Sequence, residues 1–150
     1  MTREKFNEII DFAIQGEKDA VAFYHDLQSK SRFEAQRVLL QEYEKMEEGH
    51  VTILEDIRNK GFGKIKVKEG KDLHISDYLV DVTPSANMDY QDILLMAMKK
   101  EEAAYKMYKD LASRYIGTDI ETLFQKLATE ELDHKFKFEK LYDDEILTEN

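Results

Sequence analysis

Four long segments of the chain carry apolar residues at alternating intervals of three and four positions. This spacing places the apolar side chains on one face of an α-helix and is typical of the buried faces in a helix bundle. The four predicted faces contain Phe6, Ile10, Ala13, Ala20, Tyr24 and Leu27; Leu40, Tyr43, Leu54 and Ile57; Leu94, Ala97, Ala104, Tyr108 and Leu111; and Leu127, Phe138 and Leu141. The pattern therefore predicts an all-α protein with four helices.

The ends of these helices also have recognisable sequence signals. Ser31 with Glu34, and Thr118 with Glu121, have the spacing of a capping box at the start of the second and fourth helices. The sequence "KGFG" at residues 60–63 ends the second helix. Because only short turns precede the second and fourth helices, each should lie antiparallel to the helix before it.

A long connection separates the two predicted helix pairs. Residues 61–86 are too many for a tight turn and suit a crossover along the bundle. Within them, "DLHISDYLV" predicts a short strand or a turn of helix, and the alternation in "KIKVK" would fit a small edge strand. We predict a four-helix bundle that forms a single domain over residues 1–150, with pseudo-repeats at about 3–60 and 87–147.

Polar residues interrupt the predicted buried faces at six positions, in two sets that are 84 residues apart. The six residues are Glu17, Glu47 and His50 in the first half and Glu101, Glu131 and His134 in the second. The same shift places Tyr24 on Tyr108, whereas the adjacent Glu48 falls on Leu132. The repeat therefore selects Glu47 over its neighbour.

These six residues have the chemistry of a metal site. Residues three apart lie on one face of a helix, so each Glu-x-x-His can direct a carboxylate and an imidazole to the same point. With one more Glu from each remaining helix, the bundle offers four carboxylates and two imidazoles. Four buried carboxylates repel one another, and two divalent cations would balance their charge. Such an oxygen-rich set suits iron or manganese, and zinc could also occupy it.

Several of the polar residues also have a simpler interpretation. A single Glu-x-x-His is typical of a solvated face, and Gly49 inside the motif could mark a kink, but the second copy in register favours a metal site. Tyr24 and Tyr108 could donate hydrogen bonds to ligating carboxylates or could simply fill the core. His25 lies off the buried face and should be a surface residue. His74, in the crossover, has no carboxylate at matching spacing and should not be a ligand.

Composition narrows the function further. The 150-residue chain has a net charge of −10, which argues against nucleic acid as a partner, and the basic run "KIKVKEGK" reads as a solvated loop or a docking patch. The absence of cysteine excludes disulfides, iron–sulfur clusters and a cysteine nucleophile. The N-terminal sequence has no apolar leader and no segment approaches membrane-spanning length, so we expect a cytoplasmic protein without a membrane partner.

At this point the sequence resembles the rubrerythrin family of ferritin-like proteins. The resemblance rests on "GEKDAVAFYHDL" (16–27), "EEGH" (47–50), "KEEAAYKMYKDLA" (100–112) and "EELDH" (130–134). It implies a ferritin-like bundle with a di-iron centre. It also implies that Glu47 and Glu131 bridge the irons, that Glu17 and Glu101 are terminal ligands, and that His50 and His134 each hold one iron.

The sequence departs from the rubrerythrin pattern in two respects. Rubrerythrins carry a cysteine-ligated rubredoxin domain, so the lack of cysteine implies that electrons come from an external donor such as a rubredoxin-like protein. Rubrerythrins also have an additional Glu one turn beyond the terminal ligand of the third helix, where this chain has Ala104. The ligand set is therefore closer to that of bacterioferritin.

The resemblance predicts a di-iron oxidoreductase that reduces hydrogen peroxide, or dioxygen, to water and takes part in defence against oxidative stress. In the first alternative, the same site oxidises ferrous iron for release or storage, as a ferroxidase would. In the second, the chain is a non-catalytic helical bundle in which a metal such as zinc serves structure alone. We expect a homodimer.

Overall fold

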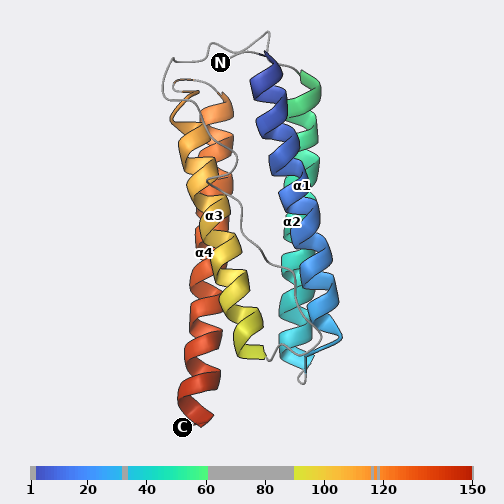
Figure 1. Cartoon of the computed structure of the whole chain (residues 1–150), viewed down its shortest axis with the longest axis vertical. Helices are drawn as coiled ribbons and strands as arrows, with labels where there is room; N and C mark the ends of the chain where they lie inside the picture. Colours follow the sequence, from blue (N-terminus) through green and yellow to red (C-terminus); the bar gives the residue numbers. More distant parts are fainter. Residues whose placement is uncertain (1–2, 32–33, 61–89, 116, 118, 150) are drawn as a thin grey trace. The chain divides into compact units, whose positions relative to one another are not determined.

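The computed structural model describes residues 3–31, 34–60, 90–115, 117 and 119–149. These residues form four helices, α1 (Arg3–Gln28), α2 (Glu34–Lys60), α3 (Tyr90–Ala112) and α4 (Asp119–Glu149), which Figure 1 shows in sequence colours. The chain divides into two compact units, Met1–Ile65 and Lys66–Asn150. We call α1 with α2 the first helix pair and α3 with α4 the second helix pair. The prediction of a ferritin-like all-α fold is confirmed.

The buried faces of the helices agree closely with the predicted ones. Every residue predicted to lie on the buried faces of α1 and α2 is buried. In the second helix pair, Ala104 and Leu141 are half-buried, and the other predicted apolar residues are buried. Phe124 and Ala128, which the pattern did not assign, are buried as well and widen the apolar face of α4.

The connection between α1 and α2 is short and hydrogen bonded. The backbone N–H of Lys30 donates to the carbonyl of Leu27 at 3.0 Å. The hydroxyl of Ser31 donates to the same carbonyl at 3.1 Å, so Ser31 satisfies the C-terminal end of α1. The reciprocal hydrogen bonds of the predicted capping box of Ser31 with Glu34 stay a prediction.

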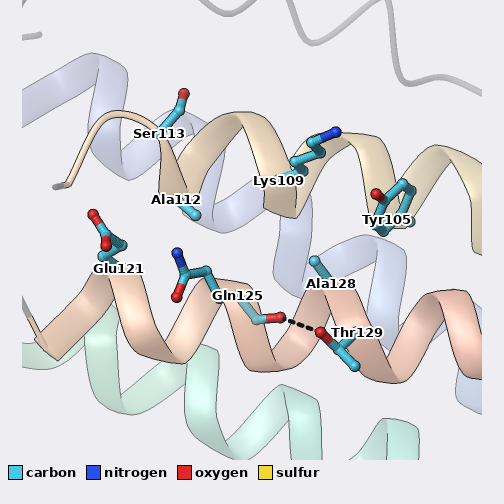
Figure 2. Close-up of a pocket in the computed structure, with 8 residues that line it drawn as sticks. All are labelled: Tyr105, Lys109, Ala112, Ser113, Glu121, Gln125, Ala128 and Thr129. Carbon is cyan, nitrogen blue, oxygen red and sulfur yellow. Dashed lines mark hydrogen bonds between the residues drawn. The ribbon is translucent and has the colours of Figure 1, made fainter.

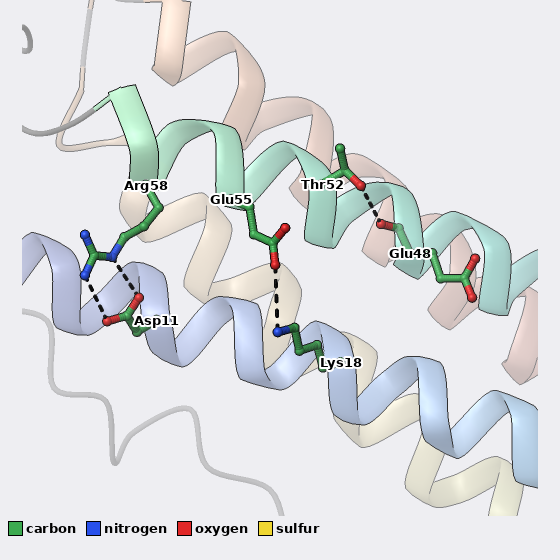
Figure 3. Close-up of polar contacts among 6 residues, drawn as sticks. All are labelled: Asp11, Lys18, Glu48, Thr52, Glu55 and Arg58. Atoms are coloured by element: carbon green, nitrogen blue, oxygen red, sulfur yellow. Dashed lines mark hydrogen bonds and ion pairs between the residues drawn. The ribbon is translucent and has the colours of Figure 1, made fainter.

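Exposed ion pairs join α1 and α2 on their outer side, as Figure 3 shows. Arg58 Nε donates to Asp11 Oδ1 at 2.8 Å, and Lys18 Nζ lies 3.7 Å from Glu55 Oε1. Since late residues of α2 meet early residues of α1, the two helices are antiparallel, as predicted. Exposed ion pairs of this kind contribute only about 0–1 kcal/mol each, so the register depends mainly on the buried face.

The turn between α3 and α4 differs from the turn in the first helix pair. The N–H of Tyr115 donates to the carbonyl of Ala112 at 3.1 Å, and Tyr115 itself is fully buried. Gly117 has φ of +81°. This left-handed conformation is unfavourable for residues that have a side chain, whereas glycine adopts it freely. Its N–H donates to Glu121 Oε2 at 3.1 Å, within the first turn of α4. Thr118, the other residue of the predicted capping box, lies outside the described residues.

Several predictions fall outside the residues that the structure describes. These are the crossover with its strand or helical turn, the "KIKVKEGK" run and His74. The single-domain organisation also stays a prediction. Over its described residues, none of the four helices is long and apolar enough to cross a membrane.

Candidate metal centre

The first helix pair brings one carboxylate from α1 together with a carboxylate and an imidazole from α2. Glu17, Glu47 and His50 are only 3%, 1% and 2% exposed. His50 Nδ1 lies 3.5 Å from Glu17 Oε2 and 3.4 Å from Glu47 Oε2. The three-residue spacing on α2 places Glu47 and His50 on the same face, and the antiparallel neighbour supplies Glu17 at the same level. We call these residues the first triad.

The second helix pair repeats this arrangement with Glu101 from α3 and with Glu131 and His134 from α4. All three residues are buried, and His134 Nδ1 lies 3.5 Å from Glu101 Oε2. We call these residues the second triad. The internal repeat found in the sequence is thus also a repeat in structure, with the same residue types at the same places in each helix pair.

Each triad is compact enough to hold a metal ion. In each triad, one oxygen from each of the two carboxylates and one ring nitrogen of the histidine all lie within 4.8 Å of one another. Buried carboxylates are costly unless a cation or hydrogen-bond donors compensate their charge. A donor set of two carboxylates and one imidazole fits a divalent cation, and its oxygen-rich character favours iron or manganese over softer metals. Each triad therefore forms a candidate carboxylate–histidine metal site.

In the protein without metal, the two carboxylates of the first triad shift the pKa of His50. Burial alone would lower the pKa of His50, because it disfavours the charged ring. The hydrogen bonds and negative charges of Glu17 and Glu47 outweigh burial and raise the pKa of His50 from 6.5 to about 11. At neutral pH a protonated His50 therefore compensates part of the carboxylate charge. A metal ligand must be a neutral imidazole, so a bound metal takes the place of that proton.

Tyr24 and Tyr108 are fully buried at equivalent positions in the two helix pairs. The ring of Tyr24 contacts those of Phe23 and Tyr43, with centroids 5.5 Å and 5.8 Å away. The ring of Tyr108 stacks on Phe124 with centroids 6.1 Å apart. Both tyrosines thus belong to the core, and their predicted hydrogen bonds to ligating carboxylates stay a prediction.

Histidine 25 is a surface residue, as predicted. His25 is exposed, and its Nδ1 lies 3.0 Å from Glu44 Oε1 on α2. Gln28 Nε2 donates to the other oxygen of the same carboxylate at 2.6 Å. These three side chains form a polar cluster between α1 and α2, close to the turn that joins them.

The second helix pair has a groove at the equivalent place, which sequence reasoning missed. The groove has a volume of about 540 Å³ and lies between α3 and α4, as Figure 2 shows. Its lining residues are Tyr105, Lys109, Ala112, Ser113, Glu121, Gln125, Ala128 and Thr129. Ala112 and Ala128 follow Gln28 and Glu44 by 84 positions, so short side chains leave open the space that the polar cluster fills in the first helix pair.

Comparisons with known proteins bear on the same residues. Residues 92–150 match the family model named Rubrerythrin. The chain resembles the rubrerythrin family. The matched residues cover nearly all of the second helix pair, including Glu101, Glu131 and His134. The resemblance that the sequence predicted is therefore confirmed over these residues, and the first helix pair has the same three residue types 84 positions earlier.

One solved structure has a fold similar to that of this chain. It is a hypothetical protein from Pyrococcus furiosus, 25% identical to this chain, with a TM-score of 0.67. The similarity covers 91% of this chain and 87% of the other. A search of curated proteins gives no match.

Proposed function

We propose that the two triads hold two iron ions and that the chain reduces hydrogen peroxide, or dioxygen, to water with electrons from an external donor. The observation that carries this proposal is the duplicated triad, in which buried ligand atoms lie within 4.8 Å of one another. The similarity of residues 92–150 to rubrerythrin supports iron over other metals. The assignment needs both triads, and each would hold one ion through its two glutamates and its histidine.

The residues of the chain have separate roles in this proposal. When bound, two ferrous ions supply the two electrons that break the O–O bond. Glu17 and Glu101 hold one ion each, and His50 and His134 contribute neutral nitrogen ligands. The four carboxylates keep the site near neutrality and can accept and return protons as the oxidant is reduced. Burial of the triads keeps bulk water from the reacting oxygen.

The ligand set lacks the additional glutamate of rubrerythrins, because this chain has Ala104 at that position. It lies one turn beyond Glu101 on α3 and is half-buried, so α3 offers no second carboxylate at the place where rubrerythrins have one. Each helix pair therefore contributes the same three ligands. We propose that the chemistry depends on this symmetric set.

The test is anaerobic loading with ferrous iron, followed by rapid mixing with peroxide or with dioxygen. We expect fast oxidation at two irons per chain, with peroxide as the faster oxidant, and repeated turnover only when a reductant is supplied. Glu47→Gln and Glu131→Gln should each slow oxidation strongly. Glu48→Gln is the matched control, because Glu48 is the exposed neighbour of Glu47 and should leave oxidation unchanged.

Other outcomes would identify the alternatives. Oxidation that continues to many irons per chain would favour iron handling over peroxide reduction. Tight binding of zinc, with no oxidation of ferrous iron at either triad, would favour a structural metal. Identical kinetics for the wild type and Glu47→Gln would overturn the proposal.

A further inference from the structure

The groove between α3 and α4 lies where the internal repeat of the two helix pairs breaks down (Figure 2). Ala112 and Ala128 line it, and the residues 84 positions earlier are Gln28 and Glu44. The exchange removes an amide and a carboxylate from the second helix pair. The resulting groove of about 540 Å³ is within the range of roughly 300–1,000 Å³ that is usual for small-molecule sites. The groove is therefore large enough for a ligand.

The first helix pair shows which chemical group occupies the equivalent space. The carboxylate of Glu44 lies there, and the side chain of Glu44 is only 20% exposed. Gln28 Nε2 donates to Glu44 Oε2 at 2.6 Å, and His25 Nδ1 lies 3.0 Å from Glu44 Oε1. This place in a helix pair is therefore suited to a carboxylate that is held by nitrogen groups.

The second helix pair keeps a nitrogen group at this place but not the carboxylate. Lys109 stands 84 positions after His25 and, unlike a histidine, has a full positive charge at neutral pH. Its Nζ lies 5.8 Å from the centroid of the Tyr105 ring. Among the residues that the structure describes, no carboxylate forms an ion pair with Lys109. The ammonium group is thus available to an anion that enters the groove.

Two hydroxyls of the groove are already hydrogen bonded to the backbone. Ser113 Oγ donates to the carbonyl of Asp110 at 2.6 Å, and Thr129 Oγ1 donates to the carbonyl of Gln125 at 2.9 Å. Figure 2 shows the side-chain amide of Gln125 directed from α4 towards α3. The amide of Gln125 and the ammonium group of Lys109 therefore offer hydrogen-bond donors from the two helices to one ligand.

Glu121 is the acidic residue among those that line the groove, and it lies at the end nearest to the turn between α3 and α4 (Figure 2). Its Oε2 accepts a hydrogen bond from the N–H of Gly117 at 3.1 Å, in the first turn of α4, where negative charge is favourable. Lys109 lies further from this turn, beside Tyr105. The two charges therefore orient a ligand, with its anionic group beside Lys109 and away from Glu121.

We propose that this groove binds a small organic carboxylic acid, whose carboxylate takes the place that Glu44 occupies in the first helix pair. The carboxylate accepts hydrogen bonds from Lys109 and from the amide of Gln125. The apolar part of the acid packs on the methyl groups of Ala112 and Ala128, both of which are buried. The inference does not depend on the iron chemistry proposed above, because none of these residues belongs to a triad.

The exposure of Lys109 limits the affinity that we expect. An ion pair in contact with water is weak, so a small acid should bind with a Kd on the order of millimolar. An acid with an aromatic body should bind more tightly than acetate, because it covers more of the apolar floor of the groove. Added salt should weaken the binding, since it screens the charge of Lys109.

The test uses the full chain, kept free of metal so that an acid cannot bind to a metal ion, and benzoate as the probe. Backbone amide chemical shifts, followed by nuclear magnetic resonance during the titration, identify the residues that the acid contacts. We expect saturable shifts of the α3 and α4 residues that line the groove and no shifts at the equivalent positions of α1 and α2. Benzamide, the uncharged analogue, should bind about tenfold more weakly, because the charge-assisted hydrogen bond is lost.

Three variants complete the test. Lys109→Gln should weaken benzoate binding about tenfold, for the same reason. Ala112→Gln with Ala128→Glu should abolish it, because the new side chains fill the groove and supply a carboxylate from within the chain. Lys106→Gln is the matched control and should leave binding unchanged, because Lys106 pairs with Glu102 on α3 and does not line the groove.

Equal affinity for benzoate and benzamide, unchanged benzoate binding in Lys109→Gln, or the absence of saturable shifts in the groove would overturn the inference. Shifts produced by a short glutamate peptide but not by benzoate would assign the groove to a protein partner and would overturn it as well. None of these results bears on the proposed function, which the anaerobic oxidation of ferrous iron tests separately.

Discussion

The two helix pairs contain the same triad but surround it with different side chains. In the first helix pair, Gln28 and His25 both contact the carboxylate of Glu44, at 2.6 Å and 3.0 Å. In the second, Ala112 and Ala128 stand at the positions of Gln28 and Glu44, and a groove of about 540 Å³ lies there. A helix pair thus tolerates a polar cluster or a groove near its turn. The buried glutamates and histidine recur in both, which indicates that chemistry rather than packing specifies the triad.

The two helix pairs also differ in the aromatic residues of their cores. Phe124 lies between Tyr108 and Tyr115, with centroid distances of 6.1 Å and 5.7 Å, and its counterpart in the first helix pair is Leu40. The first helix pair instead has Tyr43 where the second has Leu127. Aromatic packing therefore stabilises the second helix pair near its turn, whereas the first places a second phenol near the triad.

The largest expected effect concerns this aromatic packing. Phe124→Ala should lower the free energy of unfolding by about 4 kcal/mol, because it removes a fully buried ring and two aromatic contacts. Leu40→Ala, at the equivalent position of the first helix pair, should cost about 3 kcal/mol. Urea denaturation of the metal-free protein measures both values. An equal or larger loss for Leu40→Ala would show that the two ring contacts do not stabilise the second helix pair.

The second effect concerns protons in the first triad. Because the pKa of His50 is raised to about 11, metal binding at neutral pH must displace its proton. Metal affinity of the first triad should therefore rise with pH by about tenfold per unit for each proton displaced. Calorimetric titration with Zn²⁺ in buffers of different ionisation enthalpy counts the released protons. His25→Gln is the control, because His25 is exposed and should leave the count unchanged.

The same pKa sets the opposite trend for the stability of the metal-free protein. A raised folded-state pKa means that His50 stabilises the fold fully below pH 6.5, its usual value, and that this stabilisation is lost as pH rises towards 11. His50→Gln should flatten the decline of stability between pH 7 and about pH 10. A release of no proton on metal binding, or an unchanged decline in His50→Gln, would contradict this description of the first triad.

A smaller effect tests the polar cluster directly. Gln28→Ala with Glu44→Ala installs the residues of the second helix pair in the first, and should cost about 1 kcal/mol in urea denaturation, since the hydrogen bond they share is partly buried. The reverse exchange, Ala112→Gln with Ala128→Glu, should be neutral or slightly stabilising because the groove has room for both side chains. Destabilisation by the reverse exchange alone would show that the groove is needed by the fold.

The smallest effect concerns glycine in the helices. Gly49 lies inside α2, is exposed, and a Cβ there would meet no atom within 4 Å. Gly49→Ala should therefore stabilise the protein by about 0.5–1 kcal/mol, measured by thermal unfolding, without changing metal content. Gly117→Ala is the contrasting variant and should destabilise the protein, because Gly117 has φ of +81°. A loss of stability in Gly49→Ala would mean that α2 requires a local distortion beside His50.

Periodicity alone predicted the features that depend on which face of a helix a residue occupies. The intervals of three and four placed Glu17 and His50 on the buried faces of neighbouring helices. In the structure, Glu17 Oε2 lies 3.5 Å from His50 Nδ1. The repeat then selected Glu47, which is buried, over Glu48, which is exposed. These predictions succeed because helix geometry fixes the direction of a side chain once the buried face of the helix is known.

Features that depend on two helices at once could not be predicted in this way. The groove exists because the short side chains of Ala112 on α3 and Ala128 on α4 line the same space, and no periodic pattern in one helix indicates this combination. Ser31 fits a capping box by spacing, yet its hydroxyl donates to Leu27 because the chain folds back at that point. The pKa of His50 likewise depends on a carboxylate from another helix.

The central claim is that each triad binds one metal ion. The most direct measurement is the metal content of protein loaded anaerobically with ferrous iron and freed of unbound metal, for the wild type and for two matched variants. We predict two irons per chain in the wild type, and one or none in both Glu47→Gln with His50→Gln and Glu131→Gln with His134→Gln. Retention of two irons in either variant, or no bound iron in the wild type, would contradict the claim.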